Sequence, residues 1–284
     1  MSGDRLLAID QLRAAIAELS DRWQREAATA SFFEEHAVPL VEGNVATFAV
    51  LGEADSVYLR HRVNPWPDDL ELARIPGTDL WFLTIELDWA ARVEYQFEIV
   101  RDGQWWRFND PYNPRLARSP FGDCSVCQGP GYATPDWASF QTETDPGQLI
   151  ELGVHSLAQR RDNRVSVYLP AGFEPTARYP LLIVHDGGDY LDYASMKIVL
   201  DNLIHDKLLT KIIVAFSYPG ERLTEYPDDR DHAQWITGEL LPRLEGEFPL
   251  LATPIDRCLM GTSFGAVAAL STAVRFPGTY GSLL

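Results

Sequence analysis

Ser263 lies in the pentapeptide Gly-Thr-Ser-Phe-Gly (residues 261–265), a pattern that can hold a nucleophilic serine. Such a serine needs its hydroxyl raised clear of the backbone, and a sharp strand-to-helix turn achieves this when glycines on both sides permit close approach. Residues 257–260 (Arg-Cys-Leu-Met) resemble a buried strand, and residues 266–270 (Ala-Val-Ala-Ala-Leu) resemble a helix start whose dipole favours negative charge. The pattern predicts a nucleophile at Ser263, with a plain Gly-Ser loop as the alternative.

Acyl transfer also needs two backbone N–H groups that stabilise the charge developing on the carbonyl oxygen. The N–H of Phe264 is predicted to be one of them. The second is expected from the turn after an earlier strand, and residues 182–189 run from Leu-Ile-Val into His-Asp-Gly-Gly-Asp. We predict the N–H of Gly188, or of its neighbour Asp189, as the second donor; an ordinary tight turn is the alternative.

The elements that must position these residues alternate between strand and helix after residue 149. Strands are predicted at residues 164–169, 181–184, 211–216 and 257–260, and helices at 196–204 and 232–248, the latter kinked or divided by Pro242. This order predicts a mostly parallel sheet with helices on both faces. The chain ends in Tyr-Gly-Ser-Leu-Leu (280–284), which is similar to the opening of a further strand, so the sheet is expected to be incomplete at its C-terminal edge.

The N-terminal half has different patterns. An apolar stripe with helical spacing predicts one helix, capped by Asp4 and docked on the chain's own sheet rather than in a dimer: Leu6, Ile9, Leu12, Ile16, Leu19 and Trp23. Short strands are predicted at residues 45–51, 57–63, 80–87 and 94–100, with a tight hairpin at Asp102 and Gly103. These strands predict a small all-β sandwich.

Residues 110–146 are rich in Pro, Gly, Asp and Ser and are predicted to connect two domains. The expected organisation is an N-terminal helical segment (1–36), a β-sandwich with its connecting segment (37–146) and an α/β domain (147–284).

The composition is that of a folded globular protein, with 46% hydrophobic and 23% charged residues among 284. The net charge of −17 opposes binding to nucleic acid or to anionic lipid. No apolar run is long enough to span a bilayer, and the N-terminus lacks the pattern of a signal peptide, so a cytoplasmic protein is expected. Cys124 and Cys127 form one CxxC without the further ligands of a zinc site, so reduced, non-functional thiols are expected, with a metal or redox role as the alternative.

Several motifs in this order resemble the enterochelin esterase and putative esterase family of α/β-hydrolases, whose members join an immunoglobulin-like early-set sandwich to a catalytic domain. They are Asp-Gly at 102–103, Asp-Pro-Tyr-Asn-Pro-Arg at 110–115, Tyr-Leu-Pro at 168–170, His-Asp-Gly-Gly at 185–188, Arg222 with Glu225 and Tyr226, Glu-Leu-Leu-Pro at 239–242, and the 261–265 turn. The resemblance implies that Ser263 is the nucleophile and that Gly188 and Phe264 are the oxyanion donors. It also implies that Arg222, Glu225 and Tyr226 lie at the substrate mouth; an exposed ion pair is the alternative for Arg222 and Glu225.

The catalytic acid and base of this fold follow the serine in the chain, yet residues 264–284 contain no Asp, Glu or His. Three explanations are open: a truncated hydrolase, which we favour, a natural pseudo-enzyme, or a triad with an upstream base. The candidates for that base are His185 and His232. We interpret His185 as shaping the oxyanion turn and His232 as lying at a solvated helix start, and we do not expect a metal site at residues 228–232.

The sequence therefore predicts a serine esterase that hydrolyses a carboxylic ester, siderophore-like or a carbohydrate or aryl ester, through an acyl-enzyme at Ser263. No cofactor is expected, the partner is a small-molecule ester, and the chain as given is expected to be inactive. The alternative is a non-catalytic binding protein whose sandwich stacks ligands on its tryptophans, although packing in the core is the commoner role of such rings. These tryptophans are Trp66, Trp81, Trp89, Trp105 and Trp106.

Overall fold

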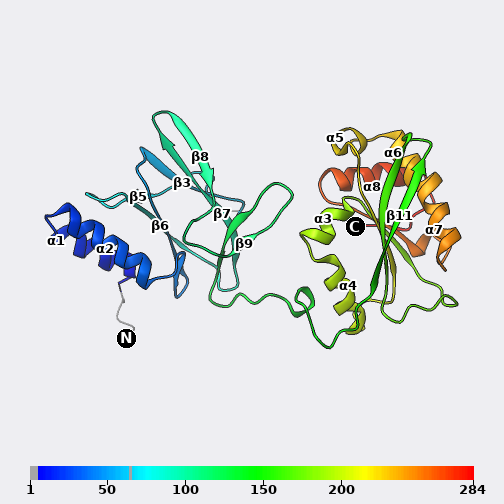
Figure 1. The fold of residues 1–284 in the computed structure, drawn as a ribbon, viewed down its shortest axis with the longest axis horizontal. Helices are drawn as coiled ribbons and strands as arrows, with labels where there is room; N and C mark the ends of the chain where they lie inside the picture. The colour runs from blue at the N-terminus through cyan, green and yellow to red at the C-terminus, as the bar shows by residue number, and fades with distance from the viewer. Residues whose placement is uncertain (1–5, 64–65) are drawn as a thin grey trace. The chain divides into compact units, whose positions relative to one another are not determined.

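The computed structural model describes residues 6–63 and 66–284, and the chain divides into two compact units, residues 1–133 and 134–284 (Figure 1). The predicted boundary at residue 146 differs from this division. Residues 134–147 belong with the second unit because they bind helix α4 (Met196–His205). The amide of Asn202 donates to the carbonyl oxygens of Trp137 (3.1 Å) and Ser139 (2.8 Å), and the carboxylate of Asp201 accepts from the N–H of Gly147 (2.8 Å).

Two helices open the first unit: α1 (Ala8–Glu18) and α2 (Arg22–Glu35). The prediction of a single helical stripe through Trp23 was wrong, because the Asp21 carboxylate accepts from the N–H groups of Trp23 and Gln24 and starts a second helix there. Trp23 is therefore exposed on α2. The predicted cap, Asp4, lies outside the described residues.

Docking of the first helix on the chain's own sheet is confirmed. Side chains from α1 and α2 share a core with the four-stranded sheet of the same unit: Ile9, Leu12, Ile16 and Phe32 pack with Ala49, Leu80 and Phe82. The helical segment therefore belongs to the sandwich unit and is not a separate layer of the chain.

The first unit contains two antiparallel sheets. The four-stranded sheet has the order β1 (Leu40–Glu42), β2 (Val45–Leu51), β6 (Leu80–Glu86), β5 (Ala73–Arg74). The six-stranded sheet has the order β4 (Leu70–Glu71), β3 (Ser56–His61), β7 (Arg92–Arg101), β10 (Cys124–Gln128), β9 (Leu116–Ala117), with β8 (Gln104–Phe108) also paired to β7. Apolar residues from both sheets, among them Phe48 and Phe97, form one core, as in a sandwich. The immunoglobulin-like early-set assignment stays a prediction.

The hairpin predicted at residues 101–104 is confirmed. Arg101 pairs with Gln104, and both turn residues have positive φ, 52° at Asp102 and 71° at Gly103. The interpretation of residues 110–128 as a connection was wrong, because they supply β9 and β10. Asp110 explains why: its carboxylate accepts from the buried hydroxyl of Tyr95 at 2.6 Å, which fixes this segment to β7.

The two cysteines of the CxxC lie on β10, and they are unpaired. Residues three apart in a strand point to opposite faces of the sheet. Burial raises the pKa of Cys127 to about 12, so its thiol stays protonated at neutral pH.

The second unit is built on one mixed sheet with the order β11 (Gln148–Ser156), β12 (Arg161–Leu169), β14 (Ile213–Ser217), β13 (Leu181–Val184), β15 (Arg257–Met260), β16 (Ser282–Leu283). Strands β14, β13, β15 and β16 are mutually parallel, whereas β11 and β12 form an antiparallel hairpin that pairs antiparallel with β14. The strand predicted to begin near residue 280 is confirmed as β16.

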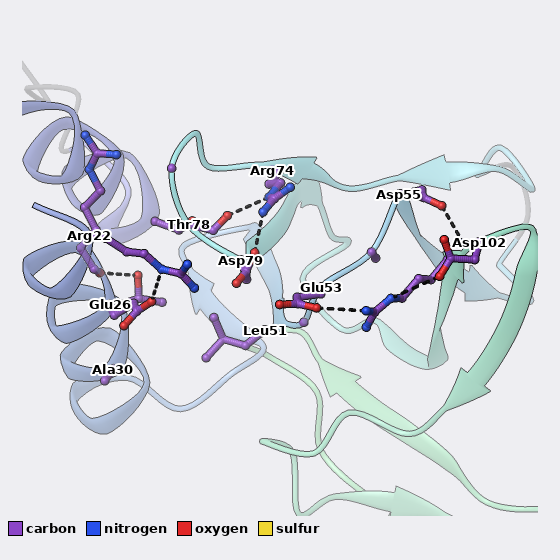
Figure 2. Close-up of a pocket in the computed structure, with 16 residues that line it drawn as sticks. Arg22, Glu26, Ala30, Leu51, Glu53, Asp55, Arg74, Thr78, Asp79 and Asp102 are labelled. Carbon is purple, nitrogen blue, oxygen red and sulfur yellow. Dashed lines mark hydrogen bonds and ion pairs between the residues drawn. The ribbon is translucent and has the colours of Figure 1, made fainter. Parts of the chain in front are cut away.

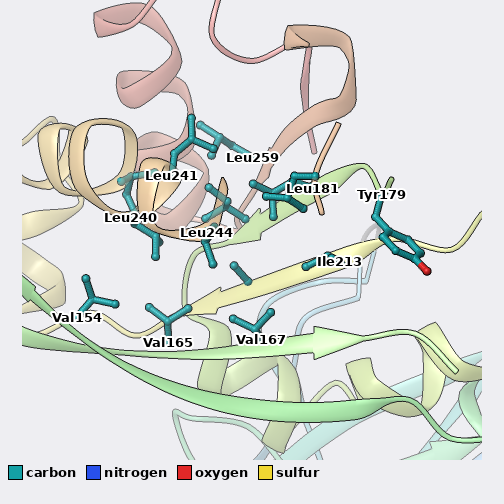
Figure 3. Close-up of a cluster of buried hydrophobic side chains, with 14 of the residues drawn as sticks. Val154, Val165, Val167, Tyr179, Leu181, Ile213, Leu240, Leu241, Leu244 and Leu259 are labelled. Carbon is teal, nitrogen blue, oxygen red and sulfur yellow. The ribbon is translucent and has the colours of Figure 1, made fainter. Parts of the chain in front are cut away.

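Helices cover both faces of this sheet, as predicted. The remaining helices are α3 (Gly187–Asp192), α5 (Arg222–Glu225), α6 (Arg230–Gln234), α7 (Leu241–Glu247) and α8 (Phe264–Arg275), with short 3₁₀ turns at Asp136–Ala138 and Pro254–Asp256. One face packs against residues of α7 and α8 in the cluster drawn in Figure 3, which includes Leu244 and Leu259. The other face packs Val184 and Phe216 against Leu200 of α4.

Pro242 modifies the long helix as predicted. Residues Trp235–Leu240 form a π-helical turn between α6 and α7, so the helix continues past the proline with a local change of pitch. Because proline has no N–H and its ring clashes with the preceding turn, a wider turn just before it relieves both problems.

Candidate active site

Ser263 lies at the turn between β15 and α8, and its backbone is strained. Its φ of 56° and ψ of −123° are values that non-glycine residues rarely adopt. Ser263 is exposed and occupies the N-cap position of a twelve-residue helix, and its side chain makes no capping hydrogen bond there. The turn predicted at residues 261–265 therefore has the geometry that presents a serine hydroxyl to a substrate.

The glycines on either side of Ser263 are required by packing. A Cβ on Gly261 would lie 2.3 Å from the carbonyl carbon of Gly265, so the strand and the first helical turn could not approach each other. A Cβ on Gly265 would lie 3.0 Å from a carboxylate oxygen of Asp186, which belongs to the loop after β13. The elbow and this loop are therefore in direct contact.

Parallel pairing brings the predicted oxyanion turn to Ser263. Val184, the last residue of β13, is in register with Met260, the last residue of β15, and the N–H of His185 donates to the carbonyl of Met260 at 2.9 Å. The carboxyl ends of neighbouring parallel strands thus carry the two motifs. A second link joins the hydroxyls of Tyr190, on α3, and Thr262 at 2.6 Å.

Gly188 and Phe264 both occupy the first turn of a helix, where backbone N–H groups lack an intrahelical acceptor. Glycine is needed at 188 because a Cβ there would lie 2.6 Å from the ring of Tyr218. The two N–H groups that the sequence predicted as oxyanion donors therefore lie in the first turns of two helices, each of which follows one of two adjacent strands.

An ion pair that the sequence did not reveal holds the oxyanion turn in place. Asp186 precedes Gly187 with a φ of 55°, and its carboxylate accepts two hydrogen bonds from Arg222, both at 2.8 Å. The side chain of Asp186 is 9% exposed and that of Arg222 is 26% exposed. The Arg222 guanidinium also lies 5.9 Å from the ring centroid of Phe264, so it joins the two sides of the site.

Tyr226 and Glu225 do not lie at a substrate mouth, contrary to the prediction. Tyr226 is 0% exposed, and its hydroxyl accepts from the N–H of Asp186 at 2.9 Å. The side chain of Glu225 is 12% exposed and accepts from Arg161 at 2.9 and 3.0 Å. Because α5 packs beneath the oxyanion turn, these two residues position that turn, and Arg222 alone of the three retains access to the site.

We predict that Tyr226→Phe lowers the free energy of unfolding by about 1–2 kcal/mol, because the Asp186 N–H loses its acceptor in a buried place. Urea denaturation of the full chain measures this loss. Tyr280→Phe is the control, since that hydroxyl bonds to Thr237 at 2.9 Å and supports no part of the oxyanion turn. An unchanged stability in Tyr226→Phe would show that water replaces the phenol.

The two histidines considered as upstream bases are both buried. His185 is fully buried, and its Nδ1 lies 3.2 Å from the carbonyl oxygen of Met260, which makes Nδ1 the donor. Burial, together with the adjacent His232, lowers the pKa of His185 to about 3. The interpretation of His232 as solvated was wrong: it is 2% exposed, and its ring packs edge-on against that of Tyr226 with centroids 5.1 Å apart.

Glu225 stays ionised beside these rings. Burial by itself raises its pKa, but His232, the backbone N–H of Glu221 and the charge of Arg161 together lower it to about 2. Among residues 6–63 and 66–284, no three His, Cys, Asp or Glu side chains are grouped to hold a metal ion. Within the same residues, no helix has the length and hydropathy needed to cross a bilayer.

Comparison with known proteins agrees with this geometry. Residues 156–284 match the family described as "Putative esterase". The chain is 28% identical over 145 residues to the uncharacterized protein YjcH of Bacillus subtilis, covering 49% of this chain and 60% of that protein. It is 26% identical over 249 residues to an iron(III) enterobactin esterase of Dickeya dadantii, covering 76% of this chain and 57% of that protein. The chain thus spans about three fifths of the length of these curated relatives, 60% and 57% respectively.

A solved structure shows the same fold. The enterobactin esterase from Shigella flexneri, crystallised in the presence of enterobactin, aligns with a TM-score of 0.70 at 22% identity, covering 88% of this chain and 74% of that chain. This alignment confirms the predicted α/β-hydrolase-like fold, with a mixed rather than wholly parallel sheet. Residues 156–284 therefore match the putative esterase family, and the chain is enterochelin esterase-like in sequence and fold.

Proposed function

We propose that this protein is a serine esterase of the carboxylic ester class, in which Ser263 forms the acyl-enzyme. The observation that carries the proposal is the strained, exposed conformation of Ser263 at the end of β15, beside the Gly-Gly turn that ends β13. Family membership of residues 156–284 supports the same reaction class.

In the first step Ser263 Oγ forms a bond to the carbonyl carbon of the ester. The negative charge that develops on the carbonyl oxygen is stabilised by the N–H groups of Gly188 and Phe264. The C–O bond to the alcohol then breaks, and the proton lost by the serine is passed by a base to the departing alcohol. In the second step water attacks the acyl group, the acid is released and the serine recovers its proton.

The base is the part of this reaction that the described residues do not bring to Ser263. His185 and His232 are buried, and none of the hydrogen bonds among residues 6–63 and 66–284 joins a histidine to the Ser263 hydroxyl. A serine hydroxyl without a base is a weak nucleophile. We therefore propose that the chain as given reacts with activated acyl donors and phosphonates but hydrolyses ordinary esters poorly.

The proposed substrate is a small-molecule ester, either siderophore-like or an ester of a carbohydrate or aryl acid. The first class is supported by the sequence relative described as an iron(III) enterobactin esterase. The second class is the broader alternative within carboxylic ester hydrolysis. A non-catalytic binding role for the sandwich remains the second candidate function, and the exposure of Trp105 and Trp106 favours it.

Treatment of the full chain with a fluorophosphonate probe tests the proposal. We predict that up to one phosphonyl group per chain attaches to Ser263, as measured by intact mass and peptide mapping. Ser263→Ala is expected to abolish it, because among residues 6–63 and 66–284 no other serine has this backbone conformation between a strand and a helix. Ser271→Ala, two turns further along α8, is the matched control and is expected to label like wild type. No labelling of the wild-type chain, or labelling that persists in Ser263→Ala, would contradict the assignment.

A further inference from the structure

The six-stranded sheet has a second face that the core does not use. Strands β3, β7 and β8 lie side by side, with Tyr58 opposite Glu98, Glu98 opposite Arg107, and Val100 opposite Trp105. Directly opposed residues share a face of a sheet, and the alternate residues of β3 and β7 are buried in the sandwich core. These five residues therefore form an outward face, called here the outer strand face.

A cavity of about 440 Å³ opens on the outer strand face, and Tyr58, Glu98 and Trp105 are among its lining residues. This volume is within the range of small-molecule sites. Trp105 is 64% exposed, which leaves a large apolar ring in water at one side of the cavity. Tyr58 supplies a second ring across the intervening strand β7, so two aromatic rings flank one cavity.

The polar groups between the rings are fixed in place. The carboxylate of Glu98 accepts from Arg60 at 2.5 Å and from Arg107 at 2.8 Å. Arg60 also pairs with Asp69 at 2.7 Å, and its guanidinium carbon lies 5.0 Å from the ring centroid of Tyr58. Because these side chains are held by one another, a ligand would meet preformed donors and acceptors and would order few groups on binding.

The chemistry of the lining selects the class of ligand. Asp69, Glu71 and Glu98 outnumber the nearby cations, Arg60 in the lining and Arg107 bonded to Glu98, so anions such as catecholates or phosphates are disfavoured. Ligand hydroxyls can both donate to the carboxylates and accept from the guanidinium. The C–H face of a sugar ring carries partial positive charge, which suits the negative face of an indole or phenol. We propose that the outer strand face binds a neutral oligosaccharide, with one sugar ring stacked on Trp105.

A larger cavity in the same unit lacks these features. It has a volume of about 1020 Å³ and lies beside α2 and the turns at the ends of the strands (Figure 2). Six of its charged side chains are paired with one another: Arg22 with Glu26, Arg74 with Asp79 and Arg101 with Glu53. Its lining contains no aromatic ring. The smaller cavity is therefore the better ligand site.

The other tryptophans that the sequence suggested for ligand stacking are less suited to it than Trp105. Trp81 is buried, Trp66 packs against the sandwich core, and Trp89 lies against Gly131. Trp106 alternates with Trp105 and so points to the other face of the sheet. Of these five tryptophans, Trp105 is the one that is both exposed and part of the lining of this cavity. The site does not involve Ser263, so it is independent of the proposed esterase activity.

Calorimetric titration of the full chain with maltoheptaose, cellohexaose and xylohexaose tests this inference. We expect saturable binding of at least one of the three in the micromolar to millimolar range. Trp105→Ala is expected to weaken it about tenfold or more, since truncating a stacking tryptophan removes over 1 kcal/mol of binding energy. Trp23→Ala is the matched control, because Trp23 is equally exposed on α2 but lies outside this cavity.

Far-UV circular dichroism and thermal unfolding establish that Trp105→Ala is folded, which its exposure leads us to expect. Titration with 2,3-dihydroxybenzoate provides the comparison with an anionic aromatic ligand. No saturable binding of any of the three oligosaccharides overturns the proposal. Equal binding by wild type and Trp105→Ala also overturns it, and so does binding of 2,3-dihydroxybenzoate alone.

Discussion

Arg222→Met is expected to lower the free energy of unfolding by about 2–3 kcal/mol, because it leaves the Asp186 carboxylate without its bidentate partner in a place that is 9% exposed. Removing one partner of a fully buried pair costs more, but Arg222 is 26% exposed and water partly replaces it. The measurement is urea denaturation of the full chain at neutral pH.

Asp186→Asn in the Arg222→Met background distinguishes an unpaired charge from lost packing. The double variant is expected to recover part of the loss, since it no longer buries a lone carboxylate. Arg222→Lys keeps the charge but not the two parallel hydrogen bonds, and should fall between wild type and Arg222→Met. If the stability losses of Arg222→Met alone and Asp186→Asn alone simply add in the double variant, the ion pair does not hold this turn.

A second readout separates a positioning role from a structural one. The Gly-Gly turn follows Asp186 directly, so release of Asp186 should displace the Gly188 N–H from the site that meets the oxyanion. We expect the rate of fluorophosphonate labelling at Ser263 to fall about tenfold in folded Arg222→Met. Arg243→Met is the control, because Arg243 pairs with Glu247 one turn further along α7.

Lowering the pH from 7 to 5 is expected to destabilise the second unit by about 2 kcal/mol through His185. Its pKa in the folded chain is about 3, below the ordinary histidine value of 6.5. Between these values the unfolded chain binds one more proton than the folded chain, so stability falls as the pH falls. The limiting slope is about 1.4 kcal/mol per pH unit. The contribution becomes complete and constant about one pH unit above 6.5.

The carboxylate of Glu225 changes the stability only at lower pH, so its contribution is separated from that of His185. Its pKa of about 2 lies below the ordinary glutamate value of 4.5, so its contribution is lost only as the pH falls from 4.5 toward 2. Urea denaturation at half-unit steps between pH 7 and 5 therefore reports on His185. His185→Asn retains a donor for the Met260 carbonyl but does not titrate, and should remove about one proton from the slope. His155→Asn, at an exposed position, should leave the slope unchanged; a wild-type curve flat from pH 7 to 5 would refute the assignment.

Local rules in the sequence were enough to find the nucleophile turn and the hairpin. The glycine at 261 answers a steric demand that arises within five residues, since a Cβ there would meet Gly265, and Asp102 and Gly103 suit a turn that needs two positive φ angles. The strand at 45–51 was also predicted with its observed bounds, because its burial follows from its own apolar residues. These features depend on chain neighbours, and so a single sequence reveals them.

Other features depended on contacts between distant residues. Arg222 is 36 positions from Asp186, and Tyr226 is 40 positions from it. Only their packing shows that Tyr226 is a buried support for the oxyanion turn and not a substrate contact. In the same way, Asp110 binds Tyr95, which makes the Pro-rich segment after it a part of the sandwich and not a connection.

The sequence by itself thus determined that a serine stands in a strained turn between a strand and a helix, because steric fit around Ser263 is a local matter. The tertiary structure alone decided which side chains support that serine and which ones reach solvent. Burial and ion pairing are properties of elements brought together in space, and no spacing along the chain specifies them.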